Sequence, residues 1–291
     1  MIAAQREPFL RVLREVYGSA MSEAEFDWWF DRNPVGPRLV TESEEEGATL
    51  GVSAMSFFRM RLGGELHDVA FAVHAATLPG ARGKGVWSAL ELHNEDQARR
   101  AGAPCVLGFT NPAAGPILVG KLGWRDLCRL RIWARPKRLR RTGRGGLRSG
   151  ADARFGERHA AMDGTLGNRI VKDEAYLRWR YEESPRAYRL IDGSRGFAVV
   201  GHTVHKGFAA GLVCELAGGG RTRLLRRLVR AIDADLVIAF VNRGEERHYA
   251  AAGFLPTPES IRFIGKPLRD GFDLPARRDA WRFTLGDLDF F

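Results

Sequence analysis

The chain of 291 residues lacks the features that mark a membrane or secreted protein. No apolar run is long enough to cross a bilayer, and residues 1–20 carry acids and bases where a signal peptide needs an apolar core. Cysteine is scarce: Cys105, Cys128 and Cys214 have no metal-ligand spacing and cannot all pair with one another. We therefore expect a soluble, cytoplasmic protein with reduced thiols, no metal and no membrane partner.

Two glycine motifs that bind nucleotide phosphates are also missing. The P-loop pattern, GxxxxGK followed by Ser or Thr, does not occur, and neither does the dinucleotide fingerprint GxGxxG. Serine-hydrolase, kinase, zinc and dinucleotide chemistry have no motif support in this sequence.

Acidic residues are absent from one strongly basic stretch. The chain has a formal net charge of +10, and residues 129–148 contain no Asp or Glu. Such a run can hold a nucleic-acid backbone, but neither aromatic residues interleaved with the charges nor a helix-turn-helix pattern accompanies it. We expect a strand followed by a solvated linker here, and nucleic acid is not the preferred partner.

The patterns that are present predict an α/β chain. Helical spacing and capping signals predict helices over residues 7–18, 22–33, 86–101 and 111–123. Strand patterns occupy residues 48–64, 65–79, 104–110 and 124–136, with a turn at Gly63–Gly64 between the first two. Residues 281–285 also have strand character, and the apolar C-terminus is expected to dock on the protein.

The stretch LPGARGKGVWSAL, residues 78–90, joins a predicted strand to a predicted helix. A helix N-terminus offers free backbone N–H groups and the positive end of the helix dipole, and glycines let a phosphate approach the backbone closely. Arg82 and Lys84 add positive charge. The turn is therefore predicted to bind a pyrophosphate group.

This stretch resembles motif A of the GNAT superfamily of N-acetyltransferases. FTNPAAGPILVGKLGW, residues 109–124, is similar to motif B of the same superfamily. The resemblance implies direct acyl transfer, most simply acetyl transfer, from acetyl-CoA to an amine on a small molecule or peptide. The basic surface suggests an acidic or sugar-like acceptor, but its identity and the oligomeric state are not readable from the sequence.

The resemblance also assigns the site residues. The donor carbonyl is expected where strands 68–77 and 105–110 splay apart, with the backbone of Ala76 and Thr77 along the pantetheine arm. Asn111 orients the cofactor or simply caps a helix. The pyrophosphate is expected on Arg82, Gly83, Lys84, Gly85, Val86 and Trp87.

Two positions depart from the family pattern, and the general base has to be inferred. Trp87 replaces a small residue, and Val119 stands where many relatives have the tyrosine that protonates the leaving thiolate. His74 is the best-placed base, with Asp68 at even spacing on the same strand face and His67 on the other. A hydrogen-bonded core histidine is the equally open alternative for His74.

The second half of the chain repeats features of the first. Trp28 and Pro34 match Trp179 and Pro185 at an offset of 151, while later matches have an offset of 130 or 131. The glycine turn AGGGRTR in the second half has lost the Arg-x-x-Gly-x-Gly order, although Tyr249 is retained where the first half has Val119. This pattern predicts a tandem protein with a degenerate second half.

The expected fold class is two GNAT-like domains, each a central mixed, mostly antiparallel sheet flanked by helices. We place the cofactor-binding domain at residues 1–140, a Gly/Arg-rich linker at 141–168 and the degenerate domain at 169–291. Two functions remain open: a CoA-dependent acyltransferase, which the intact turn favours, and a non-catalytic CoA-binding or nucleic-acid-associated module, which Val119 and the basic tract favour.

Overall fold

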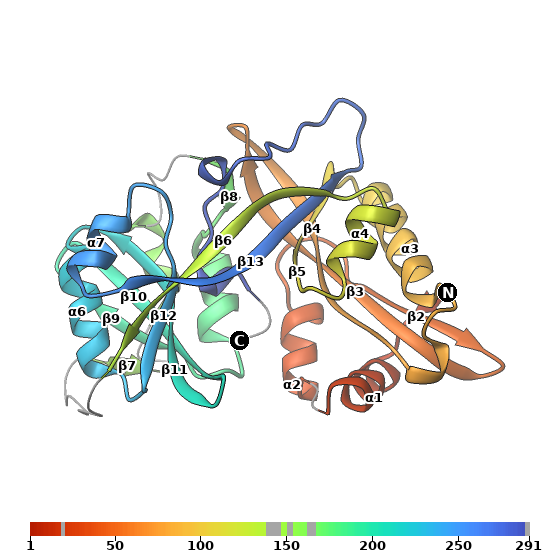
Figure 1. Ribbon diagram of the computed structural model, residues 1–291, viewed down its shortest axis with the longest axis horizontal. Coiled ribbons are helices and arrows are strands. Elements are labelled where there is room, and N and C mark those ends of the chain that lie inside the picture. Colours follow the sequence, from red (N-terminus) through yellow and green to blue (C-terminus); the bar gives the residue numbers. More distant parts are fainter. Residues whose placement is uncertain (19–20, 138–146, 150–153, 162–166, 289–291) are drawn as a thin grey trace. The chain divides into compact units, whose positions relative to one another are not determined.

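The computed structural model describes residues 1–18, 21–137, 147–149, 154–161 and 167–288. The chain forms two compact units (Figure 1). Unit 1 comprises Met1–Cys128 and Arg262–Ala276, and unit 2 comprises Arg129–Ile261 and Arg277–Phe291. Within the described ranges, no helix combines the length and the apolar character that a membrane span requires.

Unit 1 is a mixed sheet with helices on both faces. Its helices are α1 (Arg6–Tyr17), α2 (Glu23–Phe26), the π-helix η1 (Asp27–Asp31), η2 (Pro79–Ala81), α3 (Val86–Arg100) and α4 (Gly115–Lys121). Its strands are β1 (Ile2–Ala3), β2 (Leu39–Glu45), β3 (Ala48–Leu62), β4 (Glu65–Thr77), β5 (Cys105–Thr110) and the last part of β13 (Leu255–Pro267). The strands lie in the order β1-β2-β3-β4-β5-β13, and only β4 and β5 pair in parallel.

Local signals account for the first helices. The apolar face of α1 is buried, and Gly18 ends the helix with a φ of 72°, a left-handed conformation that suits glycine. Ser22 and Glu25 form the predicted capping box at the start of α2. The predicted helix 22–33 is present as α2 followed directly by the π-helix η1.

Different helices cover the two faces of this sheet. On one face, the hydroxyl of Ser53 on β3 donates a 2.6 Å hydrogen bond to Glu91 of α3. On the other face, Phe58 of β3 packs edge-on against Trp29 of η1, with ring centroids 6.2 Å apart. The side chain of each β4 residue therefore points toward either α3 or the α1–η1 side.

Unit 2 has the same kind of sheet. Its strands are β6 (Arg125–Pro136, from Arg129 on), β7 (Leu147–Ser149), β8 (Arg169–Ile170), β9 (Arg189–Asp192), β10 (Gly196–His205), β11 (Phe208–Gly218), β12 (Leu236–Phe240) and the first part of β13. Its helices are η4 (Gly156–Ala161), α5 (Glu174–Leu177), the π-helix η5 (Arg178–Glu182), α6 (Arg221–Ala231), α7 (Glu246–Ala251), η6 (Arg278–Ala280) and η7 (Leu285–Asp287). The main strands lie in the order β6-β12-β11-β10-β9-β7, and β11 and β12 pair in parallel.

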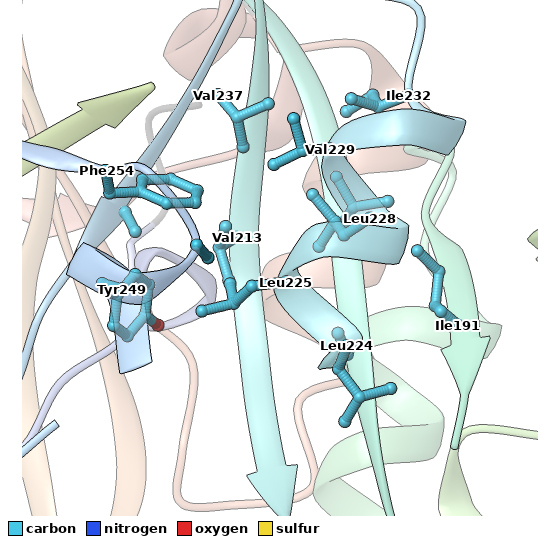
Figure 2. Close-up of a cluster of buried hydrophobic side chains, with 14 of the residues drawn as sticks. Ile191, Val213, Leu224, Leu225, Leu228, Val229, Ile232, Val237, Tyr249 and Phe254 are labelled. Atoms are coloured by element: carbon cyan, nitrogen blue, oxygen red, sulfur yellow. The ribbon is translucent and has the colours of Figure 1, made fainter. Parts of the chain in front are cut away.

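The core of unit 2 lies between α6 and the sheet (Figure 2). Leu224, Leu225 and Leu228 of α6 are buried in it. Tyr249 and Phe254 belong to the same cluster, with ring centroids 5.4 Å apart. Unit 2 therefore has a hydrophobic core of its own.

Each unit contains the same unusual transition from an α-helix to a π-helix. In unit 2 the α-helix α5 runs directly into the π-helix η5, and every boundary of this pair lies 151 residues after the boundary in α2 and η1. π-helical turns are rare, so the same junction at a constant offset supports the sequence match between Trp28 and Trp179. Helices are thus present at both predicted positions.

The unit boundaries differ from the contiguous domains expected from the sequence. β5 in unit 1 has the last part of β13 as its next neighbour, whereas β12 in unit 2 has β6. Each unit is therefore completed by a strand from a distant part of the chain. The repeat in the sequence cannot show this exchange of β6 and β13 between the units, because a repeat does not show which strands pair at the edge of each sheet.

Two local expectations are wrong. The described part of the expected linker, residues 141–168, is regular: β7 pairs with β9, and η4 follows. Residues 141–146, 150–153 and 162–166 of this linker lie outside the described residues. Residues 281–285 form no strand; Trp281 makes an isolated bridge with Asn168, and 3-10 turns lie on either side. The segment up to Leu288 is nevertheless docked, because Arg180 donates hydrogen bonds of 2.9 Å to the carbonyls of Gly286 and Leu288. The docking expected of residues 289–291 lies outside the described residues.

Candidate functional site

The glycine turn of unit 1 has the open geometry that an anion site needs. Gly83 and Gly85 both have a φ of 79°, which disfavours any residue with a Cβ, and a Cβ at either position would meet no atom within 4 Å. Gly85 is the N-cap of α3, and no side chain of the described residues caps that helix. The first N–H groups of α3 therefore open onto an exposed turn that also carries Arg82 and Lys84.

Trp87 does not obstruct this turn. Its indole packs against the hydrophobic cluster of unit 1, and its Nε1–H donates a 3.2 Å hydrogen bond to Glu91 one helical turn further on. The side chain is thus directed along the helix and into the core. The departure from the family pattern at this position leaves the backbone of the turn accessible.

β4 contains a bulge just before the turn. Met55 of β3 pairs with Ala72 and Ser53 pairs with Ala75, so that Val73 and His74 together oppose Ala54. The parallel ladder between β4 and β5 ends at the pair Ala72–Gly108, although both strands continue. The two strands therefore part at the bulge, and an acyl site there stays a prediction.

The edge of β4 beyond the bulge carries free backbone groups, but their register differs from the prediction. The N–H of Leu78 donates a hydrogen bond to the carbonyl of Leu50 on β3. In an antiparallel ladder every second residue makes such backbone hydrogen bonds, so Ala76, two residues earlier, is also hydrogen-bonded to β3. Ala75 and Thr77 turn their N–H and C=O groups toward the β5 side. The expectation that Ala76 offers its backbone to a ligand is therefore wrong, whereas Thr77 is correctly oriented.

The same bulge changes the faces of the candidate catalytic residues. Asp68 lies in register with Arg59 on the α3 side of the sheet and forms an ion pair with it at 3.0 Å. The extra residue turns His74 to the opposite face, where its ring lies 6.4 Å from that of Phe30 on η1. Asp68 and His74 therefore do not share a face, contrary to the prediction from even spacing.

His74 lies at the point where β4 and β5 separate. Its side chain is half-buried and its Nε2 atom is buried. This position suits a proton acceptor next to the splay, and its role in catalysis stays a prediction.

The motif B residues have structural contacts. The Asn111 side chain accepts hydrogen bonds of 3.0 and 2.9 Å from the N–H groups of Ala113 and Ala114, which is the capping alternative left open by the sequence. Val119 packs against the hydrophobic cluster of unit 1 and offers no proton. A cofactor contact by Asn111 stays a prediction.

Two residues near the site were missed by sequence reasoning. The hydroxyl of Tyr17, at the end of α1, donates a 2.6 Å hydrogen bond to the carbonyl of Ala75, and Arg82 Nε donates to the carbonyl of Thr77 at 3.4 Å. Burial raises the pKa of Tyr17, while Arg82 lowers it in part. Glu91 of α3 is fully buried, and burial raises its pKa to about 7 despite its hydrogen bond from Ser53. No spacing in the sequence connects either residue with β4.

Unit 2 has a bulge in the corresponding strand, but that strand is covered. β11 pairs with β10: Val213 lies opposite Val200, and Glu215 lies opposite Val199. Cys214 of β11 is therefore the extra residue of the bulge. Gly286 lies against this position: a Cβ on it would come within 2.8 Å of the Cys214 carbonyl. Glu215 is buried beside Lys172, Tyr181 and Thr284. The C-terminal segment thus occupies the surface of β11 at its bulge.

This fold is similar to that of several solved structures. No family model and no curated protein matches the sequence. Among solved structures, a GCN5-related N-acetyltransferase from Kribbella flavida is similar with a TM-score of 0.62 and 19% identity, over 92% of this chain and 71% of that one. One from Anabaena variabilis has a TM-score of 0.65 and 12% identity, over 92% and 72%. Eis1 from Mycobacterium abscessus has a TM-score of 0.60 and 12% identity over the same shares. The chain therefore has the fold of the GCN5-related N-acetyltransferases.

Proposed function

We propose that the chain is an acyl-CoA-dependent N-acyltransferase, with acetyl-CoA as the donor, and that unit 1 carries the reaction. One observation supports this most strongly: the bulged, open edge of β4 runs directly into the left-handed glycine turn at the start of α3. The first feature offers backbone groups to an extended arm, and the second offers N–H groups to a pyrophosphate. Together they match the two ends of a CoA molecule.

The residues of unit 1 fit such a donor. Gly83 and Gly85 leave open space at the turn, and Arg82, Lys84 and the N–H groups of Val86 and Trp87 would hold the pyrophosphate. The backbone N–H groups of Ala75 and Thr77, and their carbonyls once Tyr17 and Arg82 release them, would bind the arm. The proposed donor site thus keeps eight of the nine predicted residues as candidates, with Ala75 in place of Ala76.

The chemistry requires few groups from the protein. The bound thioester supplies an activated acyl carbon: the amine nitrogen forms a bond to it, and its C–S bond breaks. Backbone N–H groups at the bulge would stabilise negative charge on the carbonyl oxygen, and His74 would accept the proton that the amine loses. Val119 cannot protonate the leaving sulfur, so CoA would depart as the thiolate, which is tolerable because a thiol is a moderate acid.

The acceptor and the role of unit 2 are finer parts of this proposal. The net charge of +10 favours an acidic or sugar-like amine. The covered β11 supports a tandem arrangement in which unit 2 is degenerate for transfer. All three cysteines are free thiols, which fits a reducing compartment such as the cytoplasm.

The test is a calorimetric titration of the full chain with CoA, acetyl-CoA and longer acyl-CoAs. Gly85→Val should lower the affinity at least tenfold, because a Cβ there projects into the space that the phosphates need. Gly102→Val is a matched control: Gly102 has a φ of 88° and open space around it, but it lies just beyond the other end of α3. Equal affinity of wild type and Gly85→Val for CoA would refute the proposal.

A second candidate is a CoA-binding module that performs no transfer. The packing of Val119 in the core favours it, because the family's usual acid is absent. Release of free CoA thiol in the presence of an amine panel separates the two. CoA binding without thiol release from any amine would favour the module.

A further inference from the structure

A pocket in unit 2 has no part in the proposed reaction. It has a volume of about 490 Å³ and lies between α6 and α7. Its lining includes five cationic side chains, those of Arg221, Arg223, Arg226, Arg227 and Arg230, together with His248, and none of the described residues that line it is acidic. A neighbouring pocket of about 220 Å³ adds Arg135 and shares Arg226 and Arg230. Volumes of this order are typical of sites for small ligands.

The arginines lie along one helix without neutralising partners on it. α6 has no acid in its first turn and begins with Arg221, so its N-terminal charges oppose the helix dipole. Arg223, Arg227 and Arg230 follow at spacings of four and three, which places them on one face where like charges repel. An anion bound at this face would relieve both effects.

Several of these side chains are held in place by neutral groups. Arg226 donates a 2.7 Å hydrogen bond to the carbonyl of Ala251, and Arg227 donates one of 2.6 Å to the carbonyl of Asp192. Arg221 alone pairs with a carboxylate, that of Glu245 at 2.7 Å. Arg223 and Arg230 make no hydrogen bond or ion pair with any other residue that the structure describes. The pocket thus combines positioned guanidinium groups with two available ones.

Burial and neighbouring arginines both act on the titratable groups at the pocket. Burial is the main cause that lowers the pKa of His248; Arg247 and Arg221 lower it further, and Glu245 raises it in part. Burial likewise lowers the pKa of Arg135, with added effects from Arg230 and Arg226. Planar guanidinium groups bind phosphate oxygens in a bidentate manner, so a cluster of them favours a ligand with more than one phosphate.

We propose that this arginine pocket is a second binding site, for a small ligand that carries two or more phosphate groups. The ligand contacts the pocket through its phosphates alone, because β11 is covered at its bulge by the C-terminal segment and offers no extended edge there. The site is therefore suited to sensing a polyphosphate compound rather than to acyl transfer. This inference stands independently of the reaction proposed for unit 1.

The experiment titrates the full chain with inorganic tripolyphosphate, ATP and CoA by calorimetry at low and high salt. Because the glycine turn proposed for unit 1 would also bind phosphates, the titrations use the Gly85→Val background; there the chain should bind one tripolyphosphate, and adding R223Q/R230Q should weaken this binding at least tenfold. The control R129Q/R131Q removes the same charge from two exposed arginines of β6, outside the pocket, and should leave the binding unchanged. Unchanged thermal melting in both variants shows that they fold.

Three results would overturn the proposal. The first is that the Gly85→Val chain does not bind tripolyphosphate. The second is that adding either double substitution weakens this binding equally. The third is that a 20-nucleotide strand competes with tripolyphosphate and binds with much higher affinity. The last result would assign the pocket to nucleic acid. CoA binding that R223Q/R230Q abolishes and Gly85→Val preserves would support the pocket and refute the donor site of unit 1. The two proposals can therefore fail separately.

Discussion

The hydroxyl of Tyr17 and the carbonyl of Ala75 are joined by a 2.6 Å hydrogen bond across 58 residues of sequence. This contact closes α1 onto the one edge of β4 that lacks a strand partner beyond the bulge. A donor arm that pairs with this edge has to displace the phenol. The affinity for the donor therefore includes the cost of breaking this bond.

Replacing Tyr17 with Phe should raise the affinity for acetyl-CoA. The variant frees the Ala75 carbonyl, and a hydrogen bond of this kind contributes about 0.5–1.5 kcal/mol, or roughly two- to tenfold in Kd. Calorimetric titration of both proteins measures the difference. If Tyr17 instead donates to the donor itself, the affinity falls, and the competition that we describe does not operate.

Transfer should depend on His74 and not on Tyr249. His74→Gln is expected to lower kcat by about a hundredfold or more with one working amine, since proton acceptors contribute that much. Tyr249→Phe should stay within a few-fold of wild type, because Tyr249 is buried in the core of unit 2 (Figure 2). A large loss of activity in a well-folded Tyr249→Phe protein would assign chemistry to unit 2.

Glu91 should make the protein less stable as the pH rises. Its pKa is about 7 in the folded state, against 4.5 as the ordinary value, so the folded state retains the proton longer than the unfolded state. The free energy of unfolding therefore falls between about pH 4.5 and 7, by roughly 3 kcal/mol at 1.36 kcal/mol per unit. Urea unfolding of Glu91→Gln should show a smaller decline, whereas the exposed Glu44→Gln should follow wild type.

Lys172 should be essential to the stability of unit 2. Burial alone would lower its pKa, but Asp287 and Glu215 raise it, and its ammonium lies 2.8 and 2.7 Å from their carboxylates. Lys172→Met leaves two buried carboxylates without their cation and should cost about 3–5 kcal/mol in urea unfolding.

The control for this variant is Lys206→Met. Lys206 pairs with Glu259 at 2.6 Å, but its side chain is 66% exposed, so its loss should cost under about 1 kcal/mol. Similar losses in the two variants would show that the buried network does not hold the C-terminal segment.

Much of the fold could be predicted because its signals are local. The capping box of Ser22 and Glu25 and the hairpin turn at Gly63–Gly64 depend on residues a few positions apart. The glycine turn is of the same kind, since only glycine readily adopts the φ of 79° found at Gly83 and Gly85. The stretch AGGGRTR and the arginine spacing of α6 are equally local and left open an anion site, but a spacing does not show that these side chains line a pocket with α7.

The sequence by itself determined most of the helices and strands of unit 1, the glycine turn at residues 82–87 and the match between Trp28 and Trp179. Only the tertiary structure decided the bulge that separates His74 from Asp68, the bond from Tyr17 to Ala75, the exchange of β6 and β13 and the cover over Cys214. These features depend on which edges and surfaces meet. Such contacts join residues from 17 to more than 150 positions apart, as in Met55–Ala72 and Arg262–Thr110, and no local pattern encodes them.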